Sequence, residues 1–386
     1  MLPSPSPDAL SHSQRVSQLI RTELDTCNGW IDFARYMELA LYAPGLGYYA
    51  SGAAKFGAAG DFVTAPELSP LFGRTLAHQA AQVLAHSGGD ILELGAGSGK
   101  LAVDVLLELE RLGALPASYC ILEVSADLHA RQHAWIAARA PHLLERVQWL
   151  TTLPVAFSGV MLANEVLDAL PVHCVQWKAQ QCFERGVAWR GERLDWASRE
   201  LTSGSLWQTM HALPVGSSVG SGVYSSEINL AAAALLRALA ESIACGALIF
   251  IDYGFPQAEY YHPQRHMGTL RAHYRHHALD DPFYLPGLCD LTAHVDFSAV
   301  AAAAVDAGLQ LAGYTSQASF LINAGITERL MQTDPTEAAA YLPQANAVQR
   351  LISPAEMGEL FKVIAFSKKL EQPLVGFSRG DRSHTL

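Results

Sequence analysis

Apolar positions follow two different spacings along the chain, and the two alternate from about residue 90 onward. Short apolar runs predict buried strands at 90–94, 118–124, 147–150, 159–163 and 247–251. Segments with apolar residues three and four apart predict helices at 101–111, 126–140 and 228–244. Strands that alternate with helices are typical of a mostly parallel sheet covered on both faces, so the expected fold class is α/β.

Other segments precede, interrupt or follow this alternation. We expect a frayed start over 1–10, helices at 13–24, 31–41 and 71–86, and a long ordered loop at 42–70, which is rich in glycine, proline and aromatic residues. Residues 172–225 read as a hairpin insertion, and 253–295 as a second long loop. A helix at 297–307, a strand at 309–314, a helical insertion within 317–356 and a strand at 360–366 come next. The predicted organisation is therefore an N-terminal region (1–88), a main domain (89–370) and a polar tail (371–386).

Composition narrows the class of protein. Half of the 386 residues are hydrophobic and 16% are charged, which is not the composition of a disordered chain. With 26 basic and 37 acidic residues the net charge is −11, which disfavours a nucleic-acid partner. The six cysteines are scattered without metal-site or redox spacing, as in reduced cytosolic proteins. We see no signal peptide, mitochondrial presequence or membrane span, so the expected location is the cytoplasm.

The clearest motif is the sequence ILELGAGSG at 91–99, between a predicted strand and a predicted helix. Glycines allow a sharp turn and a close approach to a ligand, and the helix start offers free N–H groups. A phosphate-binding P-loop is excluded because Leu101 follows Gly99-Lys100 where Ser or Thr is needed. A dinucleotide-binding GxGxxG motif matches poorly, because its third glycine would fall at Lys100. The remaining spacing, with Glu93 before it, resembles motif I of S-adenosyl-L-methionine-dependent methyltransferases; a purely structural turn is the alternative.

Glu123 follows the next predicted strand, at 118–124. A carboxylate at this point of an α/β fold can accept hydrogen bonds from both ribose hydroxyls of a nucleoside. The alternative is an acid that caps the following helix beside Ser125.

The segment NEVLDALP at 164–171 follows the fourth predicted strand, at the sheet edge where open α/β folds bind ligands. It brings Asn164, Glu165 and Asp168 together, and carboxylates match the planar fork of a guanidinium group. We expect a catalytic or substrate-binding role for at least one of them; a helix-start cap is the alternative.

Six of the 15 histidines lie within 253–295. His262 and His266 are four residues apart, a spacing that some metal sites use. No cysteine pair or HExxH motif accompanies them, so we expect no metal site. Histidines that line a polar cleft or face solvent are the preferred interpretation.

Several long blocks resemble the MidA family, which includes the mitochondrial complex I assembly-factor methyltransferases and their bacterial relatives. The blocks are GYYASGAAKFGAAGDFVTAPELSPLFG, LELGAGSGKLA, ANEVLDALPV, IDYGF, HMGTLRAHYRHH and DLTAHVDFSAV, in order from about residue 35 to 297. The resemblance implies a Rossmann-like methyltransferase fold that uses S-adenosyl-L-methionine and releases S-adenosyl-L-homocysteine. Its mitochondrial members methylate an arginine of a complex I subunit, so a protein substrate with an arginine is expected.

The resemblance also assigns roles to residues. The glycine turn would hold the cofactor, Glu93 would flank it, Glu123 would bind the ribose, and Asn164, Glu165 and Asp168 would border the methyl-transfer site. The cofactor-binding set is Glu93, Gly95, Gly97, Gly99 and Glu123, with Asp61 and Thr64 added from the block that contains GDFVTAPE. A non-catalytic assembly factor and a small-molecule methyltransferase remain the alternatives.

Overall fold

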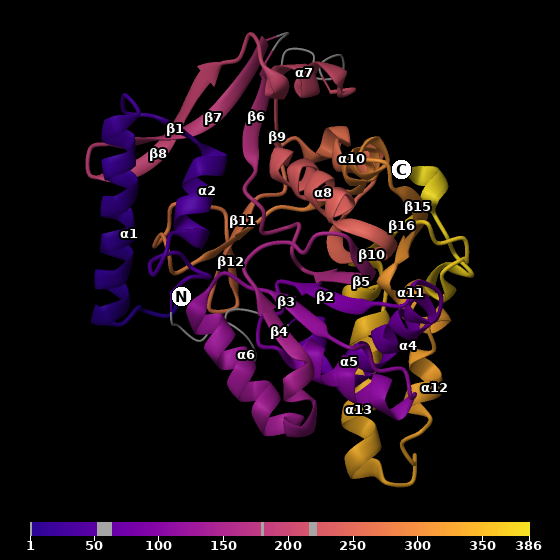
Figure 1. The fold of residues 1–386 in the computed structure, drawn as a ribbon. Helices are drawn as coiled ribbons and strands as arrows, with labels where there is room; N and C mark the ends of the chain where they lie inside the picture. Colours follow the sequence, from indigo (N-terminus) through magenta and orange to yellow (C-terminus); the bar gives the residue numbers. More distant parts are fainter. Residues whose placement is uncertain (1, 52–63, 179–180, 216–221) are drawn as a thin grey trace.

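A computed structural model describes residues 2–51, 64–178, 181–215 and 222–386. In this part of the chain, eight strands form a central sheet in the order β15-β16-β10-β5-β2-β3-β4, with β14 paired to β10 (Figure 1). The strands are β2 (Asp90–Leu94), β3 (Tyr119–Leu122), β4 (Val147–Leu150), β5 (Phe157–Asn164), β10 (Ile243–Phe255), β14 (Val295–Asp296), β15 (Gln310–Ser316) and β16 (Phe361–Lys368). Pairing is parallel from β4 to β10, and β16 runs antiparallel between β10 and β15. The predicted α/β class is confirmed.

Helices cover both faces of this sheet. One face carries α4 (Pro70–Ser87), α5 (Lys100–Arg111), α6 (Ala126–Arg139) and the C-terminal helices α11 (Gln317–Asn323), α12 (Ile326–Leu330), α13 (Ala338–Ile352) and α14 (Met357–Leu360); the other carries α8 (Leu230–Ser242) and α10 (Phe297–Asp306). Along β2, Ile91 packs into the first layer while Leu92 and Leu94 pack into the second. Burial on both faces explains why these strands are apolar runs without alternation.

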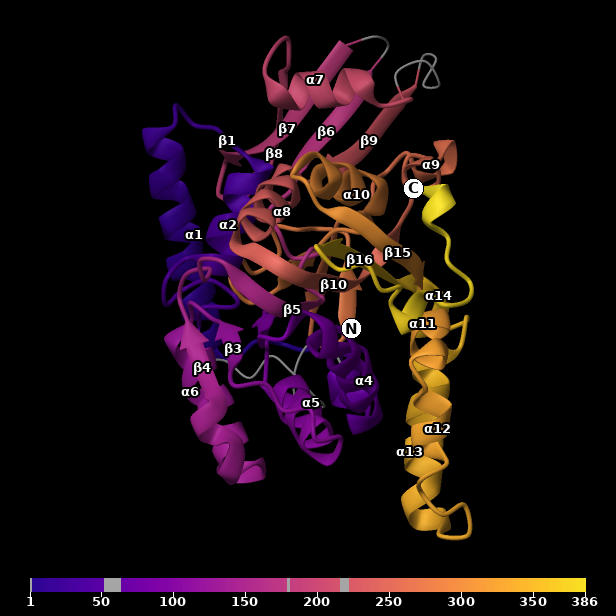
Figure 2. The same cartoon turned by 45° about the vertical axis from the view of Figure 1, so that its right-hand side comes forward.

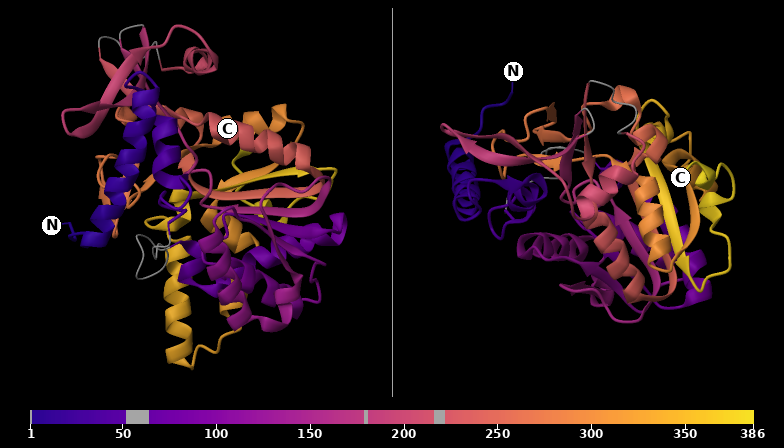
Figure 3. Two further views of the ribbon diagram at one scale, coloured as in Figure 1. Left: turned by 60° about the vertical axis from the view of Figure 1, so that its left-hand side comes forward. Right: turned by 90° about the horizontal axis from the view of Figure 1, so that it is seen from above.

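The expected hairpin insertion is larger than a hairpin. It contains β6 (His173–Lys178), β7 (Gln181–Arg190), β8 (Arg193–Glu200), α7 (Ser205–Ala212) and β9 (Val223–Ile228). With β1 (Ile31–Asp32) these strands form a second sheet, against which α1 (Pro7–Thr26) and α2 (Phe33–Tyr42) pack, as Figure 3 shows for the indigo helices and the magenta strands. The helix expected at 31–41 begins only at Phe33, because Ile31 and Asp32 pair with Val187 and Gly186 of β7.

The expected loop at 253–295 also contains regular structure. β10 continues to Phe255, and α9 (Gln257–Tyr260) follows it. Then β11 (Arg271–Tyr274), β12 (His277–Leu279) and β13 (Asp290–Thr292) form a small antiparallel sheet in the order β12-β11-β13. Polar residues dominate these short strands, so hydrophobic spacing gave no signal for them.

Both ends of the chain are more ordered than expected. α1 begins at Pro7, inside the segment expected to be frayed, because Ser6 accepts a hydrogen bond from the Ala9 N–H at 3.2 Å and caps the helix. The expected polar tail packs back on the body, where Leu374 and Phe377 join the core. Helices α12 and α13 extend beyond the central sheet (Figure 2). None of the helices in the described residues is long and apolar enough to cross a membrane.

Candidate active site

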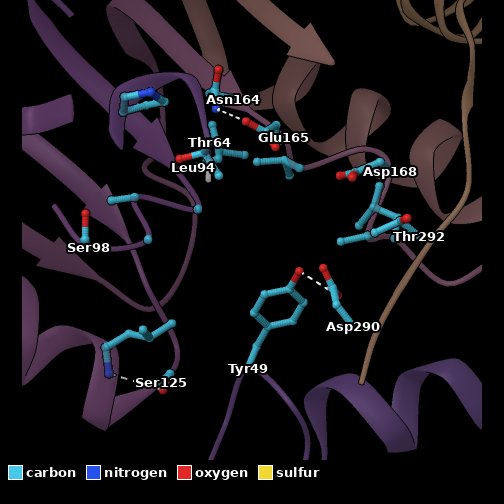
Figure 4. A pocket seen from close by; sticks show the side chains of 18 of the residues that line it. Tyr49, Thr64, Leu94, Ser98, Ser125, Asn164, Glu165, Asp168, Asp290 and Thr292 are labelled. Carbon is cyan, nitrogen blue, oxygen red and sulfur yellow. Dashed lines mark hydrogen bonds between the residues drawn. The ribbon is translucent and has the colours of Figure 1, made fainter. Parts of the chain in front are cut away.

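A cavity of about 1150 Å³ opens at the carboxyl ends of β2, β3 and β5, whose last residues Leu94, Leu122 and Asn164 line it (Figure 4). Other parts of the chain also line it, among them the segment after α2, the small sheet with β11 and β13, and the start of β16. Figure 4 shows Ser98 and Ser125 on one side of the hollow and Asp168, Asp290 and Thr292 on the other. The carboxyl edge of a parallel sheet is where α/β folds bind ligands.

The glycine turn forms the floor of one half of this cavity. Gly95 and Gly97 line it with φ angles of 65° and 53°, a left-handed conformation that glycine adopts without strain. Gly99, with φ of 80°, caps α5 and is not among the lining residues. A Cβ at Gly99 would lie 3.3 Å from the backbone of Gln132, so Gly99 allows α5 and α6 to pack closely.

Residues of the block at 60–67 hold this turn from the other side. Thr64 and Glu67 line the cavity, and Glu67 accepts a hydrogen bond from the Ser98 hydroxyl at 2.5 Å. The Lys100 ammonium donates to the Glu67 carbonyl at 3.1 Å. Asp61, the other residue predicted from this block, lies outside the described residues.

Glu93 and Glu123 are the two acids expected beside the turn, and both line the cavity. The Tyr119 hydroxyl donates to Glu93 at 2.7 Å, yet burial raises the pKa of Glu93 to about 7. One oxygen of Glu123 accepts the Ser125 N–H at 2.7 Å and the other accepts the Gln132 amide at 3.0 Å. Ser125, and not Glu123, is the N-cap of α6, and Glu123 lines the cavity.

The opposite half of the cavity is acidic. Glu165 has a φ of 54°, an uncommon conformation for a residue with a side chain, and its N–H donates to the Ile251 carbonyl at 2.8 Å. Asn164 donates its amide to the Glu165 carboxyl at 3.1 Å. Burial, followed by the nearby charge of Asp168, raises the pKa of Glu165 to about 8.

Asp252, at the carboxyl half of β10, holds the turn that carries these residues. One of its oxygens accepts the backbone N–H groups of Val166, Leu167 and Asp168 at 3.2, 2.8 and 3.2 Å. Three N–H donors on one carboxylate fix the turn in place and aim Asp168 at the cavity that it lines. Glu165 and Asp168 lie in a turn rather than a helix.

Asp168 is 5% exposed, and burial raises its pKa to about 6, opposed by the Tyr253 hydroxyl beside it. Its Oδ1 atom and the Oδ1 atom of Asn164 are buried without a hydrogen-bond partner in the described part of the chain. Buried oxygens of this kind are rare, because each forfeits its hydration. Both residues line the cavity.

Several lining residues were not predicted as site residues. The Tyr49 hydroxyl donates to Asp290 at 2.9 Å, the Tyr42 hydroxyl donates to the Ala169 carbonyl at 2.8 Å, and the two rings stack. Tyr253 stands between Asp168 and Thr292. The blocks IDYGF and DLTAHVDF contain three of these residues, but their separation along the chain concealed that they meet.

The histidines divide between two environments. Of the six, His273 and His294 line the cavity, and burial together with Arg265 lowers the pKa of His294 to about 4. Among the described residues, the group whose spacing could hold a metal ion is Asp32, His173 and Glu184. In that group His173 already pairs with Glu184 at 2.7 Å, and Asp32 caps α2 through the Arg35 N–H.

A family model described as an S-adenosyl-L-methionine-dependent methyltransferase matches residues 73–315, well over half of the chain. The chain belongs to the MidA family. Among curated relatives of this family, the mitochondrial protein arginine methyltransferase NDUFAF7 of Danio rerio is 31% identical over 86% of this chain and 82% of its own length. The Drosophila melanogaster homologue is 31% identical over 97% and 92%.

Solved structures from a bacterium agree. A likely-methyltransferase structure from Burkholderia thailandensis, bound to S-adenosyl-homocysteine, is 51% identical and superimposes with a TM-score of 0.96 over the whole of both chains. A second structure from the same bacterium is 50% identical, with a TM-score of 0.93. The protein is therefore an S-adenosyl-L-methionine-dependent methyltransferase, and S-adenosyl-L-methionine is its cofactor. The cavity fits this cofactor: a glycine turn, an acid able to accept ribose hydroxyls, and the apolar Leu122 and Leu128 line one side.

Proposed function

We propose that this methyltransferase modifies the side chain of an arginine in a protein. The observation that carries the proposal is the buried, unpartnered Oδ1 atom of Asp168, which lines the same cavity as the glycine turn. A buried anionic oxygen is costly unless a ligand completes its hydrogen bonds, and the ligand best suited to an anion is a cationic donor.

The cofactor is proposed to occupy the half of the cavity with the glycine turn. Gly95 and Gly97 would give its methionine end access to backbone, Glu93 and Thr64 would flank that end, and Glu123 would accept the ribose hydroxyls. When bound, S-adenosyl-L-methionine supplies an electrophilic methyl group attached to a sulfonium sulfur. The protein's own contribution is to orient the acceptor and to match its charge.

The acceptor is proposed to enter from the acidic half. A guanidinium presents five N–H donors in a planar fork, whereas a lysine ammonium is a compact point charge. Asp168 and the Asn164 carbonyl oxygen offer separate acceptor atoms for such a fork. The Asp168 carboxyl, whose pKa burial raises to about 6, supplies the charge in its ionised form.

The carboxylates that line the acidic half of the cavity must also accept a proton. As the nitrogen forms its bond to the methyl carbon it loses one proton, because the methylated guanidinium keeps a single positive charge. Carboxylates with raised pKa values accept protons more readily than ordinary ones. Glu165, with a pKa raised to about 8, is mostly protonated at neutral pH, so Asp168 takes the main role among the three candidates of this segment.

The curated relatives support the choice of arginine, since those of zebrafish and fruit fly are both named protein arginine methyltransferases. The family resemblance makes a subunit of a respiratory complex the first substrate to test.

The test is to incubate the purified protein with S-adenosyl-L-methionine carrying a labelled methyl group and with extract from cells that lack this protein. We expect label on arginine of one or few proteins, located by mass spectrometry and absent with the D168N variant. Label found only on lysine, or only on small cationic molecules, would overturn the proposal. The D195N variant, changed at a carboxylate of the second sheet outside the cavity, is the matched control and should label like wild type.

A further inference from the structure

Gln132 is a buried amide on α6 that bonds two residues lining the cofactor half of the cavity, Gly97 and Glu123. Gln132 is 0% exposed. Within the described residues, its amide makes three hydrogen bonds. Its nitrogen donates to the Gly97 carbonyl at 3.1 Å and to Glu123 at 3.0 Å. Its oxygen accepts the indole N–H of Trp149 at 2.9 Å. From the sequence, Gln132 was predicted only to lie on a helix.

Trp149 determines which way this amide points. An indole N–H can only donate, so the oxygen of Gln132 must face Trp149 and its NH₂ group must face Glu123 and Gly97. The two remaining partners can only accept, so the arrangement is satisfied in one orientation and in no other. β4, which carries Trp149, is thereby linked to the glycine turn after β2 and to the acid after β3.

Glu123 is held at both oxygens as a result. One oxygen accepts the Ser125 N–H and the other accepts Gln132, and an ionised carboxylate retains further lone pairs on each. The carboxylate therefore has a fixed orientation and spare acceptor capacity toward the cavity that it lines. Fixing a binding group in advance removes the cost of ordering it when the ligand arrives.

We propose that Gln132 is a positioning residue for ribose recognition, which orients Glu123 and the glycine turn as one unit. The inference rests on the ribose-binding role proposed above for Glu123. It predicts that Gln132 governs discrimination between a ribose and a deoxyribose, a property distinct from overall stability.

The experiment measures binding of S-adenosyl-homocysteine and of its 2′-deoxy analogue by isothermal titration calorimetry. A charge-assisted hydrogen bond to the missing hydroxyl should give wild type a preference of ~10-fold to ~150-fold for the ribose form. E123A should lose this preference. Q132L should lose most of it although Glu123 is intact.

Q79L is the matched control. Gln79 is also 0% exposed and uses its amide to bond Gln82 and the Gly376 N–H, away from the cavity. It should lose stability like Q132L and keep the full ribose preference. W149F, which retains the donors of Gln132 but frees its amide to turn, should lower the preference partway and covers the case in which Q132L does not fold.

The two hypotheses fail in different ways. A wild-type preference in E123A would overturn the ribose role of Glu123 itself. Loss of the preference in E123A but its full retention in Q132L, or in W149F if Q132L does not fold, would leave Glu123 in place and overturn the positioning role of Gln132.

Discussion

The two halves of the cavity are built in opposite ways. In the cofactor half, Glu123, Gln132 and Trp149 satisfy one another through a closed set of hydrogen bonds. In the acidic half, Glu165 holds a left-handed backbone conformation, and Asp168 has a buried oxygen with no partner in the described residues. Burial raises the pKa values of Glu165 and Asp168 to about 8 and about 6.

The difference corresponds to two tasks. A site that only binds a cofactor is best preformed and fully hydrogen-bonded, because nothing in it must change during the reaction. A site that grips a cation and takes its proton needs acceptor atoms that remain free and carboxylates that are ready to be protonated. The left-handed Glu165 and the unpartnered oxygen of Asp168 lie in the acidic half, where they would lower stability and serve the proposed reaction.

The strongest test of this division is to neutralise Asp168. D168N keeps the shape of the side chain and removes the charge that would hold the acceptor, so turnover should fall by ~100-fold to ~1000-fold. Binding of S-adenosyl-homocysteine, measured by titration calorimetry, should stay within a few-fold of wild type. A comparable loss in both measurements would show that the two halves are not separate.

The converse test changes a residue of the cofactor half and should weaken cofactor binding. In G97V a β-branched side chain must adopt the φ of 53° found at Gly97, at a position that lines the cavity. We expect S-adenosyl-homocysteine affinity to fall by ~100-fold or more, from strain and lost space together. Circular dichroism should still show a folded protein, and unchanged affinity would remove the turn from the cofactor site.

The pH dependence of kcat/KM separates the two acids of the acidic half. As the pH rises, ionisation of Asp168 near its pKa of about 6 should increase the rate first, and ionisation of Glu165 near about 8 should increase it again. E165Q resembles the protonated form, so it should match wild type closely at pH 7 and lose only the upper rise. A large loss at pH 7 would mean that Glu165 acts as a carboxylate at neutral pH.

The smallest expected effect is on stability. The pKa of Asp168 is raised from 3.8 to about 6, so the folded state holds the proton more tightly than the unfolded chain does. The stability gained from this proton is present below pH ~4 and is lost as the pH rises through ~6. D168N should therefore exceed wild type in unfolding free energy by roughly 2–3 kcal/mol at pH 8 and by much less near pH 4.

Urea denaturation at the two pH values measures this difference. A stability gap that stays constant with pH would show that the raised pKa of Asp168 does not contribute to it. D195N, at a residue outside the cavity, again serves as the control.

The parts of the site that sequence could predict are contiguous in the chain. Glu93, Gly95 and Gly97 lie within five residues between a strand and a helix, and local spacing with glycine conformation suffices to define such a turn. The same holds for the segment that contains Asn164, Glu165 and Asp168, which also lie within five residues, directly after a predicted strand. The strands of the central sheet other than β14 were also predictable, because burial on both faces leaves apolar runs that are visible in the sequence.

Tertiary structure alone decided which distant residues meet. Asp252 fixes the turn of Asp168 across 84 positions, and Tyr49 reaches Asp290 across 241. Short strands with polar side chains show no hydrophobic periodicity. The pairing of β1 with β7 joins distant parts of the sequence, so no local pattern indicates it. The sequence by itself determined the α/β framework and the glycine turn, since both follow from local conformation and burial. Which acid is charged was decided by the fold, because a pKa depends on the burial and neighbours that only the folded chain creates.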